Sequence, residues 1–272
     1  MAGFDPAGSE RTRPAHDART DGPVAPRPID RAQEQLFAPG RSSRAKYADL
    51  VVGQPGAIAL VKHELIVAVA QARAGALGLV LRKMLYPRLL GSCGRNVVFG
   101  QNVVLRHPRK IHIGGNVVID DNCLVDAKGE SNRGIRIGDG VFIGRNSILS
   151  CKNGDIEIGA GANIGFNCEV FSASHVRVGA SVLMAAYSYV IGGDHDFSDP
   201  SAPVLDQRRR SSGVTIGDGA WLGAGAKILD GVTIGARAVI GAGAVVRDDV
   251  APGAVAVGVP ARTVSSRVNP EP

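Results

Sequence analysis

The chain has 272 residues, of which 44% are hydrophobic and only 4% aromatic, with 36 glycines and a formal net charge of +6. This aliphatic content excludes a chain that is disordered throughout, and the basic balance suits phosphates or an anionic surface. Few aromatic rings for base stacking and no nucleic-acid motif argue against nucleic acid as a partner. The cysteines, Cys93, Cys123, Cys151 and Cys168, form no CxxC pair, so we expect reduced core thiols rather than disulfides.

Residues 1–45 mix proline, arginine, aspartate and alanine without hydrophobic periodicity. Such a segment buries too little apolar surface to offset its ordering entropy, so we expect a disordered tail. It has no basic start followed by an apolar run, so we expect no secretory signal.

Residues 46–92 are rich in helix formers and predict one helix or two. The charge-free stretches are far shorter than the about 20 residues that cross a bilayer. Arg82, Lys83 and Arg88 flank an apolar body, as in helices that lie on membranes. Residues 56–90 therefore pack against the end of the next domain or a neighbouring subunit, or contact a membrane peripherally.

From residue 93 to residue 264 an aliphatic residue, often followed by glycine, returns every six positions. The positions form seven triplets: Cys93, Phe99, Leu105; Ile113, Ile119, Val125; Ile137, Ile143, Leu149; Ile158, Ile164, Val170; Val178, Met184, Val190; Ile216, Leu222, Ile228; and Ile234, Ile240, Val246. This pattern predicts three short strands per turn and a triangular solenoid of about seven coils. The small residues Ala220, Ala226, Val232, Ala238 and Ala244 should also face inward.

The stretch "IGDGAWLGAGAKILDGVTIGARAVIGAGAVVRDDVAPGAVAVGVPART", Ile216–Thr263, resembles the hexapeptide-repeat acyltransferases, among them the galactoside, serine and polysaccharide O-acetyltransferases. The resemblance implies an all-β fold, a left-handed parallel β-helix over residues 93–264, with residues 265–272 as a C-terminal tail. It also implies acetyl-CoA as the acyl donor and a homotrimer in which CoA binds between columns.

Residues 192–213, "GGDHDFSDPSAPVLDQRRRSSG", interrupt the six-residue period and predict a long loop. Within it, His195 can take a proton from an acceptor hydroxyl near neutral pH, while a carboxylate fixes its tautomer. Asp194, Asp196 and Asp199 are the candidates for that orienting role. In the family, a histidine on a loop leaving the coil is the general base, and His195 matches it. The resemblance also lets the loop reach a neighbouring subunit.

The family resemblance extends to cofactor-binding positions. Trp221, Ala224 and Ala242 match residues that line the CoA groove, while Arg247 and Arg262 match basic side chains near the nucleotide phosphates. A backbone N–H near Gly192 or Gly193 is a candidate oxyanion donor. Arg208, Arg209 and Arg210 either bind phosphates or an anionic acceptor, or form a solvated charge run.

The remaining histidines are weaker candidates. His107 and His112 have a spacing also seen in γ-class carbonic anhydrases, but no third histidine stands two turns upstream within the repeat, so we expect no metal. His175 lies about one turn before His195 and either approaches the same corner or lies at the surface.

We therefore predict a cytoplasmic O-acetyltransferase, free in the cytoplasm or at the inner face of the membrane, that acetylates a hydroxyl of a free, nucleotide-linked or lipid-linked sugar. The helical segment is unlike the large helical domain of serine acetyltransferases. The alternatives are an N-acyltransferase on an amino sugar, a serine-type O-acetyltransferase and a non-catalytic scaffold.

Overall fold

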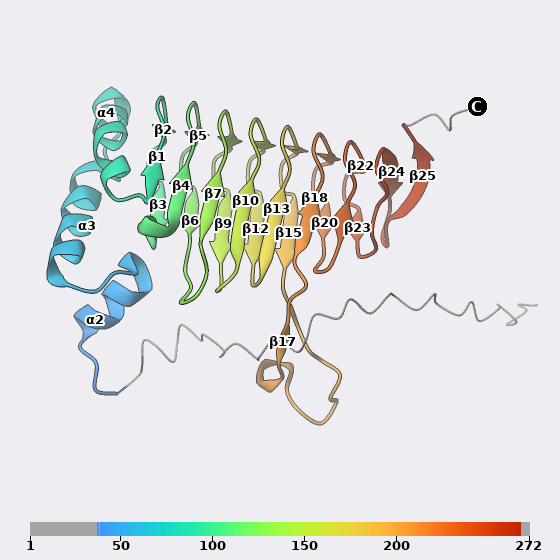
Figure 1. The fold of residues 1–272 in the computed structure, drawn as a ribbon, viewed down its shortest axis with the longest axis horizontal. Coiled ribbons are helices and arrows are strands. Elements are labelled where there is room, and N and C mark those ends of the chain that lie inside the picture. The colour runs from blue at the N-terminus through green and yellow to red at the C-terminus, as the bar shows by residue number, and fades with distance from the viewer. Residues whose placement is uncertain (1–36, 38, 268–272) are drawn as a thin grey trace, which may run out of the picture.

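The protein is a three-sided column of stacked coils with helices at one end, seen in a computed structural model that describes residue 37 and residues 39–267 (Figure 1). Each coil passes in turn through three parallel sheets, here called A, B and C. A long loop leaves the column beyond its midpoint and projects away from it (Figure 1).

The strands of each sheet stack in chain order. Sheet A contains β1 (Ser92–Cys93), β4 (Ile111–Ile113), β7 (Ile135–Ile137), β10 (Asp155–Ile158), β13 (His175–Val178), β18 (Val214–Ile216) and β21 (Thr233–Ile234). Sheet B contains β2 (Val98–Phe99), β5 (Val118–Ile119), β8 (Phe142–Ile143), β11 (Asn163–Ile164), β14 (Leu183–Met184), β19 (Trp221–Leu222), β22 (Val239–Ile240), β24 (Ala254–Val257) and β25 (Arg262–Ser266). Sheet C contains β3 (Val104–Arg106), β6 (Leu124–Asp126), β9 (Ile148–Cys151), β12 (Glu169–Ser172), β15 (Tyr189–Gly192), β20 (Lys227–Ile228) and β23 (Val245–Val246).

The six-residue aliphatic positions form the core of the column. All members of the second to seventh triplets are at most 4% exposed, and the five small residues predicted to face inward are buried with them. In sheets A, B and C, the strands from β4 to β23 each direct at least one aliphatic side chain inward, and those of sheet A from β4 to β18 direct two, so the stacked chains make one continuous core. The prediction of a parallel β-helix with seven coils is confirmed, and β24 begins an eighth.

Asparagines at the bends hold neighbouring coils together. Asn102, Asn122, Asn146 and Asn167 have positive φ, a conformation that asparagine tolerates better than most residues. The side-chain amide of Asn102 donates to Asn122 Oδ1, and that of Asn146 donates to Asn167 Oδ1, each at 3.1 Å. The bends are thus fixed by side chains as well as by the backbone.

The C-terminal end of the column is covered by a reversal of the chain. Strand β25 pairs antiparallel with β24, with a register irregularity between Val255 and Ala256. The exposed edge of sheet B is thereby paired instead of being left open.

The N-terminal end is closed by helices: α2 (Ser43–Tyr47), the π-helical turn η1 (Ala48–Val52), α3 (Ala57–Ala70), α4 (Gly75–Leu85) and the 3-10 turn η2 (Tyr86–Arg88). Helix α2 begins within the stretch predicted as a tail, where the Ser42 side chain caps it by accepting from Ala45 N–H. The predicted tail up to residue 36 and the last five residues lie outside the described part of the chain.

Two side chains attach the helices to the first coil. The buried Arg82 donates to the carbonyls of Phe99, Ala70 and Arg73, and Tyr86 Oη donates to Val103 O at 3.0 Å. Because these carbonyls would otherwise be buried without partners, the contacts make the helices a fitted cap. The expectation that this segment packs on the end of the column agrees with these contacts.

No single helix in the described residues is long and apolar enough to cross a bilayer. One bent pair, Ser43–Val52 with Ala57–Ala70, passes that test by length and composition alone.

Candidate functional site

The loop that interrupts the repeat leaves the column at the corner between sheets C and A. It follows β15 and returns to β18, and it contains a two-stranded hairpin of β16 (Asp194–His195) and β17 (Arg209–Arg210) and the 3-10 turn η4 (Val204–Asp206). The hairpin places His195 opposite Arg209 and Asp194 opposite Arg210. We call residues 192–213 the histidine loop.

The base of the histidine loop is narrow and tightly packed. Ser211 Oγ donates to Gly192 O at 2.8 Å and lies 2.7 Å from Ser174 Oγ. Gly213 has φ +83°, and a Cβ there would lie 2.4 Å from the His175 ring. Only glycine fits this approach without displacing the histidine. His175 therefore packs against the base of the loop and is not part of its tip.

Asp230 fixes the returning limb of the loop. Its carboxylate accepts from Ser212 N–H at 2.8 Å and from Gly213 N–H at 2.9 Å, although burial raises the pKa of this carboxyl. Sequence analysis did not single out this residue. Asp155 has the same role three corner loops earlier, where it accepts from Arg133 N–H and Gly134 N–H.

His195 is half-buried, and its Nδ1 atom is buried without a hydrogen-bond partner among the described residues. Asp194 Oδ1 accepts from the backbone N–H of His195 at 2.7 Å instead of from the ring. Neither Asp194 nor Asp196 therefore orients the imidazole within a single copy of the described chain. Their predicted orienting role stays a prediction.

Asp196 is committed to a different contact. Its carboxylate forms an ion pair with Arg210 at 2.9 Å and accepts from Ser198 N–H at 3.0 Å. The hydrogen bonds from Ser198 and the nearby Arg210 lower the pKa of the Asp196 carboxyl. Asp199 accepts from Ser201 N–H and so shapes the loop tip. Arg210 is therefore paired with a carboxylate of the same loop. The interpretation of residues 208–210 as a solvated charge run had not predicted this ion pair.

A second feature lies on the corner between sheets B and C. In each coil one residue occupies the equivalent position at this corner. Its carbonyl accepts a hydrogen bond from the backbone N–H of the residue that follows the equivalent position in the next coil. In chain order these residues are Gln101, Asp121, Arg145, Phe166, Ala186, Ala224 and Ala242. The side chains are large or charged in the N-terminal coils and shrink to methyl groups in the last three. The B–C corner (Ala186, Ala224 and Ala242) therefore leaves the backbone open to a close approach.

The other predicted cofactor residues lie around this end of the column. Trp221 is on sheet B and 47% exposed. Arg262 Nη1 lies 3.2 Å from Asp248 Oδ2, and Arg247 Nε lies 3.5 Å from the same carboxylate oxygen. Both arginines thus pair with Asp248, which brings them together at the C-terminal end of the column.

The histidine loop and the B–C corner lie on different edges of one column. Sheet C separates them, and the six residues from Ala224 to Asp230 at the loop base span roughly 15–20 Å in extended form. The loop also projects away from the column (Figure 1). A single copy therefore does not bring His195 next to Ala224 or Ala242.

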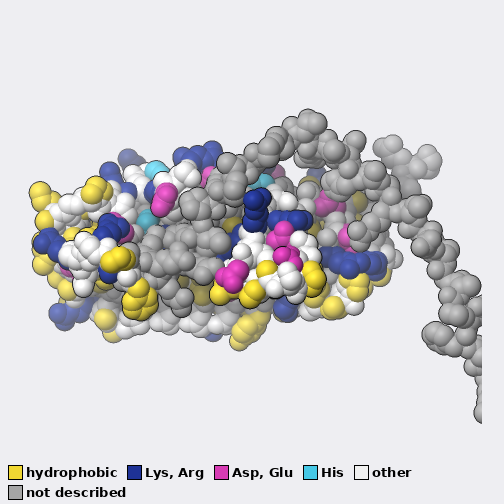
Figure 2. Space-filling model, turned by 90° about the horizontal axis from the view of Figure 1, so that it is seen from below, with side chains coloured by type: hydrophobic (Ala, Val, Ile, Leu, Met, Phe, Trp, Pro, Cys, Tyr) yellow, Lys and Arg dark blue, Asp and Glu magenta, His cyan; other side chains and the backbone are white. Residues whose placement is uncertain are grey.

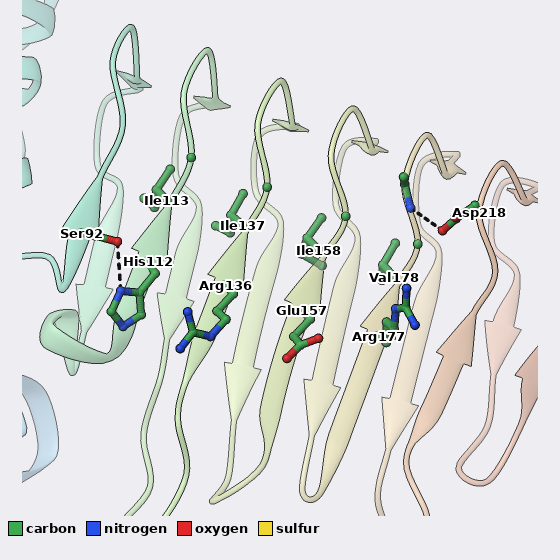
Figure 3. A pocket seen from close by; sticks show the side chains of 15 residues that line it. Ser92, His112, Ile113, Arg136, Ile137, Glu157, Ile158, Arg177, Val178 and Asp218 are labelled. Carbon is green, nitrogen blue, oxygen red and sulfur yellow. Dashed lines mark hydrogen bonds between the residues drawn. The ribbon is translucent and has the colours of Figure 1, made fainter.

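An open groove of ≈ 520 Å³ runs along sheet A, towards its corner with sheet B (Figure 3). Strand register stacks His112, Arg136, Glu157 and Arg177 across it, so that Glu157 lies between two guanidinium groups. His112 Nδ1 lies 3.0 Å from Ser92 Oγ, but burial and the nearby Arg136 and Arg109 lower the pKa of His112. Among the residues that the structure describes, no carboxylate is hydrogen-bonded to this pair, so the groove lacks the oriented base of a catalytic site.

No group of three or more His, Cys, Asp or Glu side chains among the described residues is arranged to hold a metal. His107 is buried beneath Gly53, whereas His112 faces the sheet A groove. The four cysteines are free, and Cys123, Cys151 and Cys168 are buried in the column, as predicted.

Comparison with known proteins gives the class of this fold. Residues 213–248 match the family described as bacterial transferase hexapeptide (six repeats). The matched residues span the strands from β18 to β23, in the C-terminal half of the column.

A particular relative is the probable acetyltransferase Rv3034c of Mycobacterium tuberculosis. The chain is 34% identical to it over 133 residues, which is 49% of this chain and 44% of the relative. The match thus spans less than half the length of that protein.

Solved structures similar to this chain include a mutant of AntD, an N-acyltransferase from Bacillus cereus, in complex with dTDP-4-amino-4,6-dideoxyglucose and coenzyme A (TM-score 0.48, 22% identity, 73% of this chain and 92% of that chain). Galactoside acetyltransferase in complex with coenzyme A is another (TM-score 0.42, 21% identity, 77% of this chain and 80% of that chain). Likeness at this level carries no argument about substrate.

Proposed function

We propose that the protein is an acetyl-CoA-dependent O-acetyltransferase that acts on a hydroxyl of a sugar or polysaccharide precursor, with His195 as the general base. The observation that carries the proposal is the histidine loop. It is a long insertion in an otherwise regular column, anchored by Asp230 and Ser211, and it presents an imidazole whose Nδ1 has no hydrogen-bond partner within the described part of the chain. The transferase family match over residues 213–248 and the similarity to a probable acetyltransferase support acyl transfer as the reaction class.

The proposed reaction needs one proton carrier. His195 takes the proton of the acceptor hydroxyl as its oxygen attacks the thioester carbonyl. A tetrahedral oxyanion forms, for which a backbone N–H near Gly192 or Gly193 is the proposed donor. The intermediate collapses with cleavage of the C–S bond, and the thiolate of CoA leaves with the proton from the imidazolium. The products are the acetyl ester and free CoA thiol.

The B–C corner suits the donor. At Ala186, Ala224 and Ala242 no side chain extends beyond a methyl group, so the pantetheine arm can run along the backbone and exchange hydrogen bonds with peptide groups. Trp221 would line this groove, and Arg247 and Arg262 would meet the nucleotide phosphates, exchanging Asp248 for phosphate.

Because the B–C corner and the histidine loop lie on different edges of one column, we propose that the active site forms between copies of the chain. In a closed ring each copy presents its loop to the corner of the next, and three three-sided columns pack naturally around a threefold axis. The resemblance had implied the same homotrimer.

The setting of the reaction follows from its donor. Acetyl-CoA and reduced cysteines favour the cytoplasm, and a lipid-linked sugar would bring the enzyme to the inner face of a membrane.

The test is the purified protein with acetyl-CoA and a panel of sugars and nucleotide sugars, followed by release of free thiol. Acceptor-dependent release is expected in the wild type, with a fall of roughly 100-fold or more in His195→Ala while the fold is kept. A folded His195→Ala variant with full activity would overturn the assignment. The product should be labile to mild alkali as an ester is; an alkali-stable product would show N-acylation instead.

A further inference from the structure

The helical cap carries apolar side chains on its outer as well as its inner surface. In α3, Ile66 and Ala70 are buried in the core of the column, as an end cap requires, and Leu60 is buried against Ala48 and Val52 of η1. The opposite side of the same helix shows Ile58, Val61, Leu65 and Val69, which are 86%, 51%, 62% and 44% exposed. Apart from Lys62, His63 and Glu64, α3 is thus apolar on both its inner and its outer side, which is typical of a helix with apolar surroundings on both sides.

Helix α4 repeats the arrangement. Its inner side is fixed by the buried Arg82, and its outer side exposes Leu77, Val80 and Met84 at three- and four-residue spacing. The two helices contact each other at the outer end of the column (Figure 1). Hydrophobic side chains gather at this end, with Lys and Arg beside them (Figure 2). We call the seven exposed side chains on α3 and α4 the outer apolar face.

The charge of the surrounding segment distinguishes between possible occupants. Residues 41–90 contain eight basic and two acidic residues. Arg73 and Lys83 are exposed next to the outer apolar face. A second copy seated on the same face would set this positive surface against an identical one, which is unfavourable. An anionic surface with an apolar interior complements both properties.

We propose that the outer apolar face docks on an anionic lipid bilayer, with α3 and α4 lying in the plane of the interface. The apolar side chains would enter the boundary between headgroups and acyl chains, and Arg73 and Lys83 would remain at the headgroups. Docking of this kind does not need a spanning helix, and no single helix in the described residues is long enough to be one. The proposal does not depend on acyl transfer, because its test measures binding alone.

The test is flotation of the full chain with vesicles of phosphatidylcholine alone and of phosphatidylcholine with phosphatidylglycerol. The wild type should float with the phosphatidylglycerol vesicles, and less so as salt is raised. The double variant Leu65→Gln/Met84→Gln should lose roughly tenfold or more of this binding, since both side chains would leave the interface. Arg73→Gln/Lys83→Gln should weaken binding to the anionic vesicles without creating binding to neutral ones.

The matched control is Val264→Gln at the opposite end of the column, where an equally exposed apolar side chain is replaced. It should bind as the wild type does. Unfolding curves of all variants should coincide, because every replaced side chain is exposed. A wild type that does not float, or a folded Leu65→Gln/Met84→Gln variant that floats unchanged, would overturn the proposal. So would a variant that only changes the oligomeric state, since that would make a second copy the occupant.

Discussion

Asp230 shows at the level of one residue how the column positions its loop. Its carboxylate holds two backbone N–H groups at the base of the histidine loop. Asp230→Asn keeps the size but offers one oxygen acceptor beside an amide donor, so the returning limb should shift. Because a small displacement of a catalytic group is costly, we expect kcat to fall roughly 10- to 100-fold.

The control for this prediction is Asp155→Asn, which breaks the same pair of contacts at a loop without a catalytic role. Steady-state kinetics and thermal unfolding of the two variants should show similar losses of stability but different losses of activity. Equal activities would mean that Asp230 serves only the fold.

At the level of the elements, the stability of the contact between the helical cap and the first coil should depend on pH. His107 is buried, with φ 51°, and its backbone N–H donates to Val51 O in the helical segment. Burial lowers the pKa of His107 below its ordinary value of 6.5, helped by Lys110 and Lys128. The unfolded chain therefore binds a proton that the folded chain does not. The contribution of neutral His107 to the free energy of unfolding is therefore fully present above pH 6.5, and it is lost as the pH falls below that value.

The measurement is the free energy of unfolding as a function of pH for the wild type and for His107→Asn. Asparagine tolerates positive φ but does not titrate, so the variant should lose less stability in acid than the wild type. Parallel curves for the two proteins would show that His107 does not contribute.

These elements also show what the sequence can and cannot predict. The period of six specified the strands and the core, because inward and outward side chains alternate along each short strand and a shift by one residue would expose an aliphatic residue. The gap before Ile216 located the histidine loop for the same reason. The contacts of Asp196 with Arg210 and of His107 with Val51 could not be predicted, because they join segments whose spacing has no period.

At the scale of the whole molecule, the central claim is that the active site is shared between copies. His195→Ala removes the proposed base but leaves the B–C corner intact. Ala242→Phe fills the corner but leaves the base, and Phe166 at the equivalent place three coils earlier shows that the bend tolerates such a ring. Each variant alone should be inactive, the second through loss of acetyl-CoA binding.

The most direct measurement is therefore acetyl transfer by the two variants co-expressed and purified as mixed oligomers. In a mixed ring of three, one of the three interfaces joins an intact His195 loop to an intact corner, so activity should return to roughly a third of the wild-type level. A mixture of Ala224→Phe and Ala242→Phe, both damaged on the same edge, should stay inactive. No recovery in the His195→Ala and Ala242→Phe mixture, with mixed oligomers present, would contradict the shared site.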